Sequence, residues 1–214
     1  MSKENKIKYN LKNVHIAKQT ETETDETTTY TYTDPKKIPG SVSLSLDAQG
    51  EISKFYADGI VYYVASSNNG YEGDLEVALI PSWFRTEILN EGLDSNKVLV
   101  ENANNEPEKF AMLFEFDGDV KAIRRCLYNC SCTRPSIASE TKEDTVQPGT
   151  ETLTITCSPR TDGVVKAQTG PDTTDKVYTD WYKKVYAPTE ITITEASEKG
   201  QSVKIAEETD ENKK

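Results

Sequence analysis

The sequence predicts a mainly β fold, in which two packed antiparallel β-sheets form a sandwich or partly open barrel with one or two short flanking α-helices. Three observations predict it. The stretch "SVSLSLD" (Ser41–Asp47) alternates apolar and polar side chains, and two Asp-Gly dipeptides each lie between strand-like runs. Helical spacing of apolar residues is confined to two short segments.

The first half of the chain predicts strands at three places. His15 lies in "NVHIAKQ", which has the pattern of an early strand. In "SVSLSLD", Val42, Leu44 and Leu46 share one face and serines occupy the other, as in a half-buried strand. Residues 50–65 then predict a hairpin around a turn at Asp58-Gly59, because this dipeptide accepts positive φ.

The second half repeats this pattern. Residues 109–134 predict another hairpin, around Asp117-Gly118. After the polar loop Ser136–Gly149, residues 151–160 and 163–169 predict two more strands. The sheet system therefore contains six or more strands.

Two segments predict short helices. The first, "PSWFRTEILNEG" (81–92), begins with a proline beside a serine, ends at a glycine and carries apolar residues at helical spacing. The second, "TTDKVYTDWYKKVYAP" (173–188), offers Thr173 or Thr174 as N-cap and stops at Pro188.

Composition limits the function. The 214 residues fit one main domain, and a hydrophobic fraction of 35% predicts a modest core, so the chain gains by assembling. Thirty-six acidic residues against 25 basic ones give a net charge of −11, which repels phosphate backbones and anionic membranes. No apolar run reaches the roughly 20 residues that span a bilayer, and the start lacks a signal-peptide core. We therefore expect no membrane insertion and synthesis in the cytoplasm.

The sequence offers little catalytic chemistry. His15 is the only histidine, and no nucleophile motif accompanies it. Cys126, Cys130 and Cys132 have the same parity, so on a strand they would share one face, and Cys157 lies on a later strand that could pair with theirs. Buried thiols in a sheet core are the favoured interpretation, with a thiolate metal site as the alternative.

Acidic clusters add no site. Asp117 and Asp119 flank a glycine, and "NNGYEGD" (68–74) offers oxygen ligands, but neither has the spacing of a calcium loop. Phosphate-cradling glycine loops are absent as well. We therefore expect no enzyme activity, no cofactor and no catalytic or metal-ligating residue.

The order of several segments resembles a known family. These are "KNVHIA", "KKIPGSVSLSLDAQGEISKFYADGIVYY", "GYEGDLEVALIPSWFRTEILN", "KFAMLFEFDGDVKAIRRCLYNCSCTRPS" and "ETLTITCSPR". Together they look like the major tail protein, or tail tube protein, of long-tailed, non-contractile bacteriophages that infect Gram-positive bacteria. The resemblance covers about residues 1–187. Its most telling pieces are "PGSVSLSLD…FYADG" and "RRCLYNCSCTRPS", which are patterns of sheet positions.

The resemblance implies a structural protein of the virion tail. Its subunits would close into hexameric rings, and the rings would stack into a hollow tube through which DNA passes into the host without specific binding. Tape-measure, distal tail and tail-terminator proteins would be its partners. An acidic lumen suits a conduit for a polyanion. The candidate lumen carboxylates are Glu115, Asp117 and Asp119.

The chain divides accordingly into an N-terminal arm (1–12), a tail-tube β domain (13–188) and an acidic C-terminal extension (189–214). Within the domain, "TETETDETTTYTYTD" (Thr20–Asp34) has strand formers at period two but no aliphatic side chain. We expect it to be loose in a lone subunit and to order between rings by strand addition, as an assembly loop; a solvent loop is the alternative. Its expected interface residues are Thr20, Glu21, Glu23, Asp25, Glu26, Tyr30 and Tyr32.

Two further contacts between subunits are expected. Lys6 and Lys8 of the arm could lie on an acidic neighbour, or the arm could be an ordinary free terminus. Trp83 and Phe84 could supply an apolar patch for ring closure, or could belong to the core.

A different class of function is the main alternative. A monomeric carbohydrate- or cell-wall-binding β-sandwich module would stack sugars on aromatic side chains, with Tyr62, Tyr63, Trp181 and Tyr182 as candidates. A metal-dependent hydrolase would need a second histidine or a carboxylate cluster, and the sequence has neither.

Overall fold

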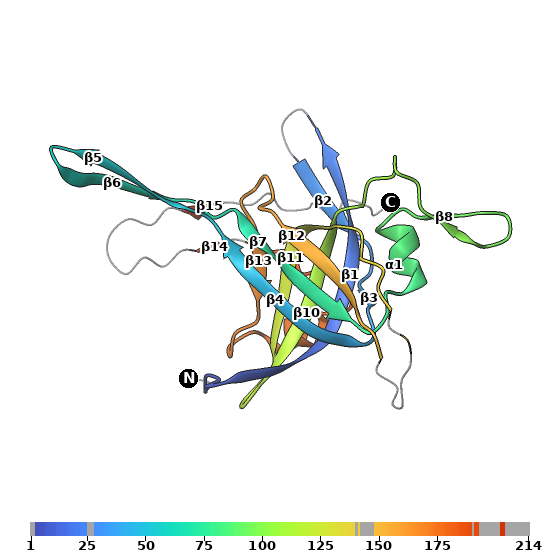
Figure 1. Ribbon diagram of the computed structural model, residues 1–214. Coiled ribbons are helices and arrows are strands. Elements are labelled where there is room, and N and C mark those ends of the chain that lie inside the picture. The colour runs from blue at the N-terminus through green and yellow to red at the C-terminus, as the bar shows by residue number, and fades with distance from the viewer. Residues whose placement is uncertain are drawn as a thin grey trace, which may run out of the picture.

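The computed structural model describes residues 3–24, 28–139, 141, 148–189, 191–192 and 202–203, the last two pairs by their backbone (Figure 1). The predicted mainly β fold is confirmed: a large antiparallel sheet, small two-stranded sheets and two short helices form an arrangement consistent with a β-sandwich. The strands of the large sheet are β1 (Lys8–Glu23), β2 (Thr28–Tyr32), β3 (Lys36–Lys37), β4 (Ser41–Gln49), β7 (Gly70–Val77), β10 (Phe110–Gly118), β11 (Ile123–Cys132), β12 (Glu151–Cys157) and β13 (Lys166–Gln168).

The strand order is β2-β1-β10-β11-β12-β7-β4, with β13 also paired to β11 and β3 to β1. Smaller elements surround this sheet. They are the pairs β5 (Ile52–Ala57) with β6 (Ile60–Ser66), β8 (Gly92–Leu93) with β9 (Leu99–Val100), and β14 (Ile191–Thr192) with β15 (Ser202–Val203), and the helices α1 (Ser82–Glu87) and α2 (Asp175–Asp180). Strands β14 and β15 thus contain four residues of the expected C-terminal extension.

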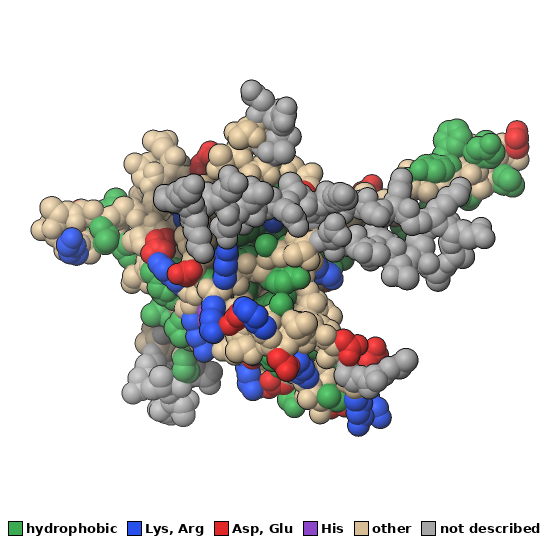
Figure 2. All heavy atoms as spheres, turned by 180° about the vertical axis from the view of Figure 1, so that it is seen from behind, with side chains coloured by type: hydrophobic (Ala, Val, Ile, Leu, Met, Phe, Trp, Pro, Cys, Tyr) green, Lys and Arg blue, Asp and Glu red, His purple; other side chains and the backbone are tan. Residues whose placement is uncertain are grey.

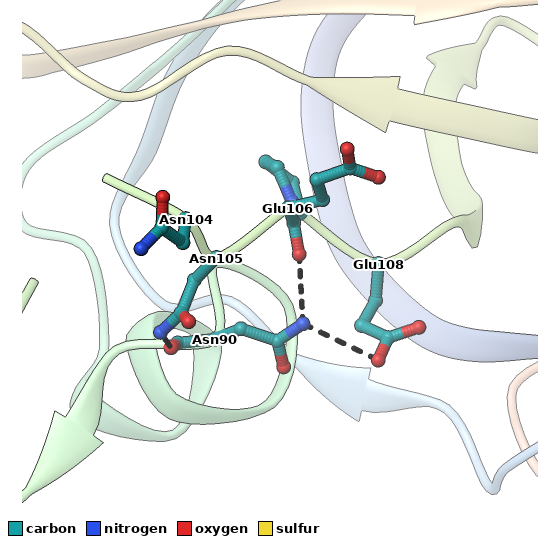
Figure 3. Close-up of a pocket in the computed structure, with 6 residues that line it drawn as sticks. Asn90, Asn104, Asn105, Glu106 and Glu108 are labelled. Atoms are coloured by element: carbon teal, nitrogen blue, oxygen red, sulfur yellow. Dashed lines mark hydrogen bonds between the residues drawn. The ribbon is translucent and has the colours of Figure 1, made fainter. Parts of the chain in front are cut away.

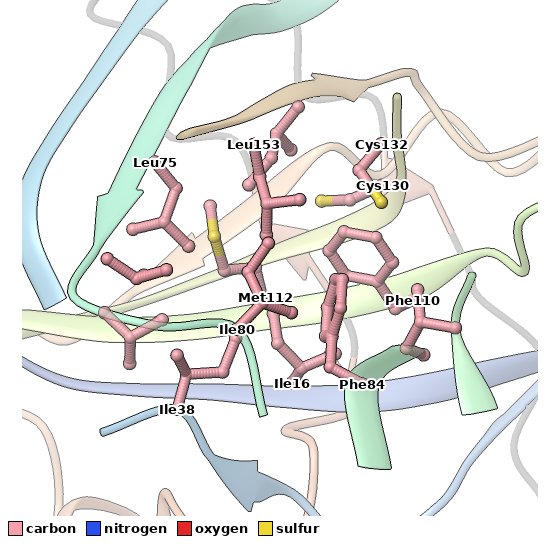
Figure 4. Packing of buried hydrophobic residues seen from close by; sticks show 14 of the residues in the cluster. Ile16, Ile38, Leu75, Ile80, Phe84, Phe110, Met112, Cys130, Cys132 and Leu153 are labelled. Carbon is pink, nitrogen blue, oxygen red and sulfur yellow. The ribbon is translucent and has the colours of Figure 1, made fainter. Parts of the chain in front are cut away.

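The sheet buries apolar side chains on both faces. The larger cluster packs β1, β7, β10 and β12 against helix α1, where Phe84 meets Phe110 edge to face with ring centroids 6.1 Å apart (Figure 4). On the other face, Ala17, Leu113 and Tyr128 pack against Trp181 and Val185, which lie in and after the turn that follows α2. Neighbouring residues of β1 and β10 therefore point to opposite faces and pack in two separate cores.

Two β-bulges place some side chains on a different face of the sheet from the one predicted. The register of β4 shifts between Ser41 and Ser43, so Val42 turns outward, whereas Leu44 and Leu46 pack against the larger core as expected. In β11, Asn129 has φ 50° and the register with β10 shifts near it. The shared face predicted for Cys126, Cys130 and Cys132 is therefore wrong, because the bulge leaves Cys126 in the smaller core and the other two in the larger one.

Turns and helices also differ from their predicted bounds. The Asp58-Gly59 turn is confirmed, with φ values of 52° and 76°. Asp117 and Gly118, however, end strand β10, and the turn follows them. Helix α1 stops at Glu87, short of the predicted Gly92, because the chain turns through Asn90 in a left-handed conformation. Helix α2 has the predicted cap position Thr174 but spans only six residues.

We expect Gly73→Ala to destabilise the fold by about 3 kcal/mol. A Cβ at Gly73 would lie 1.9 Å from the backbone oxygen of Ser45, so strands β4 and β7 would have to separate. Chemical unfolding measures the change. Gly170→Ala is the control, because a Cβ there meets no atom within 4 Å. Equal stability of the two variants would contradict this account.

Candidate functional site

The most unusual surface is the hairpin β5–β6. It continues strands β4 and β7 beyond the body of the molecule and projects away from it (Figure 1). Large apolar side chains cover it, and in Figure 2 they stand out as a green group near its end. The exposed residues are Ile52, Phe55, Tyr56, Ile60, Val61, Tyr62, Tyr63 and Val64, of which Tyr62 is 71% and Ile52 69% exposed. An exposed apolar concentration of this kind marks an interaction surface.

Both faces of this hairpin are apolar. Phe55 lies opposite Tyr63, and Tyr56 opposite Val61, with a register shift between the two pairs. Since directly opposed residues share a face and adjacent residues alternate, these two pairs point to opposite sides. A hairpin that lay on a single surface would need only one apolar face. The β5–β6 hairpin is therefore suited to burial on both sides.

A second exposed apolar group lies on the β8–β9 loop, which leaves the body on the side opposite the β5–β6 hairpin (Figure 1). Leu93, Val98 and Val100 are each about half exposed there. The local sequence pattern predicts neither hairpin as a contact between subunits. The available signal was the run of unbroken apolar residues at 60–64, which does not alternate as a half-buried strand should.

Most described residues of the expected assembly loop lie in strands of the same chain. Residues 20–23 end β1, and residues 28–32 form β2, with Thr20 opposite Thr31 and Glu21 opposite Tyr30. The prediction of a loose segment is therefore wrong for these residues, whereas Asp25 and Glu26 lie outside the described residues.

Polar contacts replace the missing aliphatic core of this hairpin. The Tyr30 ring lies 4.1 Å from the Arg160 guanidinium carbon, and its hydroxyl is 2.9 Å from that of Thr161. Tyr32 donates to the Gln19 Oε1 at 3.1 Å. Glu21 lies 3.5 Å from the Lys109 Nζ, and Glu23 pairs with Thr28. Cation–π and hydrogen-bond contacts hold strand β2 where burial could not.

Part of the N-terminal arm contacts acidic residues of its own chain, whereas Lys8 has no ion pair among the described residues. Asn5 accepts hydrogen bonds from the backbone of Val120 and Lys121, at 2.8 and 3.0 Å, and so holds the β10–β11 turn. The backbone of Lys6 donates to Asp119 at 2.7 Å. Lys12 pairs with Asp117 at 2.6 Å. Residues 5–12 are therefore held against strand β10 and the turn that follows it.

Two bulges in β1 orient this pairing. Asn10 and Asn13 have φ values of 54° and 51°, and the register with β10 shifts beside each of them. Their side chains donate to the carboxylates of Asp117 and Glu115, at 2.8 and 2.7 Å. Asparagine tolerates the left-handed conformation and supplies the donor at the same time.

Glu115 is not a lumen carboxylate, because it is only 6% exposed. It accepts from Arg124 at 2.9 Å and from the Tyr182 hydroxyl at 3.2 Å, in addition to Asn13. Arg124 in turn lies over the Tyr178 ring at 3.8 Å and donates to the Tyr178 backbone oxygen. This buried polar cluster attaches the segment around α2 to the sheet. Asp117 is partly exposed and Asp119 exposed, and residues of the arm contact both.

His15 belongs to the same region and has a structural role. Its ring lies 4.6 Å from that of Tyr182, and its Nδ1 is 2.8 Å from the Asn13 backbone oxygen. Burial lowers the pKa of His15, and it raises the pKa of Tyr182 together with the nearby Glu115 charge. Both side chains thus contribute to the packing of β1 against the segment around α2.

Other expected sites are placed in the core. Phe84 is fully buried and Trp83 is half-buried against the same cluster, so Phe84 cannot contribute to an interface patch. Trp181 is buried and stacks on Tyr186 at 5.4 Å. The expected sugar platform is therefore not assembled, because Trp181 and Tyr182 pack in the smaller core while Tyr62 and Tyr63 lie on the projecting hairpin.

The cysteines are buried thiols. Cys130 and Cys157 lie opposite each other on β11 and β12, with their sulfurs 2.6 Å apart. Burial raises the pKa of Cys126 and Cys130 and brings that of Cys132 to about 12, so these thiols stay protonated. No group of three or more histidine, cysteine or acidic residues suited to a metal occurs in the described part of the chain.

One polar hollow is present beside the loop before β10. It is open, encloses about 510 Å³ and is lined by Asn90, Asn104, Asn105, Glu106, Pro107 and Glu108. Figure 3 shows that these residues already bind one another: Asn90 donates to the Glu106 backbone oxygen at 2.7 Å and to Glu108 at 3.3 Å. The amides thus serve to fold the loop, and the hollow lacks apolar walls for a ligand.

Comparison with known proteins gives no family. No family model matches the chain, and no curated protein is similar to it. Within the described residues, neither helix has the length and apolar character needed to cross a bilayer. The candidate functional surfaces are the exposed apolar side chains of the β5–β6 hairpin and the β8–β9 loop.

We expect Glu115→Gln to lower the free energy of unfolding by about 3 kcal/mol, because it leaves the Arg124 charge partly buried without a partner. Chemical denaturation measures this value. Asp117→Asn on the same strand is the matched control and should cost much less, because its ion pair with Lys12 is solvent-exposed. Similar losses in the free energy of unfolding for both variants would show that the buried Glu115 contributes no more to stability than Asp117.

We also expect His15 to make the fold acid-sensitive. Since burial lowers its folded-state pKa below 6.5, the unfolded chain binds the proton more readily. Stability should therefore fall as the pH drops from about 7 to about 5, and His15→Gln should weaken that dependence. Denaturant titrations at several pH values test this. An unchanged slope in the variant would assign the acid sensitivity to the carboxylates.

Proposed function

We propose that this chain is a structural subunit that assembles with copies of itself into stacked rings, as in the tail tube of a long-tailed bacteriophage. The observation that supports it best is the β5–β6 hairpin, whose apolar side chains are exposed on both faces. Burying a Phe, Ile or Val side chain is worth roughly 1.5–3 kcal/mol. The hairpin therefore offers enough apolar surface to offset the entropic cost of association.

The arrangement of the two hairpins supports rings. The β5–β6 hairpin and the β8–β9 loop leave the body on opposite sides and differ in sequence (Figure 1). Contacts between unlike surfaces are heterologous, and such contacts generate closed rings or open filaments. Isologous dimers, by contrast, use the same patch on both subunits.

The resemblance to tail tube proteins adds the biological setting. In this proposal the protein lies in the virion tail and conducts DNA without binding it, and its net charge of −11 suits that task. Hexameric symmetry and contacts with tape-measure, distal tail and tail-terminator proteins follow from the resemblance. The free outer edge of strand β2, with Tyr30 and Tyr32, is available as the contact between rings.

The chemistry of the described residues favours a structural role over the alternatives. The carboxylates of Asp117 and Glu115 hold β1, β10 and the α2 segment together. Of the four aromatic residues expected to stack on sugars, only Tyr62 and Tyr63 are exposed, because Trp181 is buried and Tyr182 packs in the smaller core. That function remains the competing outcome of the experiment below.

Negative-stain electron microscopy and light scattering over a concentration series test the proposal. We expect rings or tubes for the unchanged protein. Replacing Tyr56, Val61 and Val64 by Thr keeps strand propensity while removing much of the apolar surface, and should raise the assembly concentration at least tenfold.

Leu79→Thr with Ile137→Thr is the control, because both side chains are exposed and lie off the hairpin. This variant should assemble normally. A protein that stays monomeric at every concentration and binds cell-wall glycan saturably would contradict the proposal and favour the carbohydrate-binding alternative.

A further inference from the structure

Three cations lie on one face of the sheet, the face of the larger core, along a diagonal across strands β1, β11 and β13. We define the cationic row as Lys8, Arg125 and Lys166, on strands β1, β11 and β13. Phe116 joins the first two, since the Lys8 Nζ and the Arg125 guanidinium carbon lie 5.6 and 5.3 Å from its ring centroid. Tyr71 holds the third, because Lys166 donates to its hydroxyl.

The cationic row has no counter-charge in the described part of the chain. None of its members belongs to an ion pair there. The Arg125 Nε is buried and lacks a hydrogen-bond partner, and burial lowers the pKa of Arg125. A partly buried cation without a carboxylate is costly, so an anionic partner would stabilise it.

The sheet itself carries a matching row of carboxylates. We define the acidic row as Glu72, Asp74 and Glu76 of β7, which lie on alternate positions and so share a face. Hydroxyl groups surround them: Thr154 donates to Asp74 and Ser43 to Glu76, both at 2.8 Å. Among the described residues none of the three forms an ion pair.

The two rows cannot meet within one subunit. Tyr71 and Leu75 of β7 point to the larger core, together with Phe116 beside the cationic row. The acidic row alternates with them and therefore points to the opposite face of the same sheet. Among the described residues the two rows therefore cannot pair with each other, whereas a second copy of the chain can bring one row against the other.

We propose that the cationic row of one subunit binds the acidic row of a second copy of this chain. Charge identifies the occupant, since the three cations of one row and the three carboxylates of the other form no ion pair among the described residues. The contact is heterologous, so each subunit has one row free for the next. This inference rests on the proposed function, and it adds the contact that sets the register between subunits.

Charge reversal in two complementary variants tests the contact. The first is Lys8→Glu with Lys166→Glu, at exposed positions, and the second is Glu72→Lys with Asp74→Lys, also exposed. Each variant alone presents like charges at the contact, so its assembly concentration should rise at least tenfold. An equimolar mixture should assemble again, because each variant then meets an oppositely charged neighbour. Lys184→Glu, on the segment beyond α2, is the control and should assemble normally.

The outcomes separate this inference from the proposed function. Assembly of both variants at the unchanged concentration would overturn the contact while leaving self-assembly intact. Variants that fail and are not restored by mixing would also overturn it. If the unchanged protein forms no assembly at any concentration, both proposals fall.

Zero-length carbodiimide cross-linking of an equal mixture of ¹⁴N and ¹⁵N chains gives an independent readout. Mixed-isotope links from Lys8 or Lys166 to Glu72, Asp74 or Glu76 are expected. Assemblies without such links would overturn the contact.

Discussion

The pairing of β1 with β10 is the interaction on which the rest of this structure depends. Residues of β1 alternate between the two cores, so Ile16 packs under α1 while Ala17 packs against the Trp181 segment. The same strand pair carries the bulge asparagines and the buried Glu115, to which the α2 segment is attached. Beyond the paired region, β1 turns into the β1–β2 hairpin. The β1–β10 hydrogen bonds thus position the two cores, the segment around α2 and the β1–β2 hairpin.

The β5–β6 hairpin and the two charged rows differ in the kind of interaction that they offer a neighbouring molecule. The β5–β6 hairpin offers apolar area, which supplies affinity but little directional specificity. The cationic and acidic rows offer the reverse, since charge complementarity sets register and excludes wrong partners more than it adds affinity. A subunit that combined them would associate through the hairpin and be aligned through the rows. An assembly of many identical copies needs both properties.

Contacts within the chain explain why several plausible sites have structural roles. Asp117, Glu115 and His15 have the residue types of catalytic or lumen groups. In the folded chain Lys12 pairs with Asp117, Arg124 pairs with Glu115, and the Tyr182 ring packs against that of His15. These contacts stabilise the fold.

The sequence by itself determined the class of fold, the positions of most strands and the Asp58-Gly59 turn, because alternation and turn chemistry are local properties. Tertiary structure decided which face each side chain occupies after a bulge, as at Val42 and Cys126, since one extra residue reverses every later position. It also decided that Glu115 is buried while Tyr62 is exposed. Partners far apart in the chain, such as Asn5 with the β10–β11 turn, carry no signal in the local pattern, so only the assembled sheet brings them together.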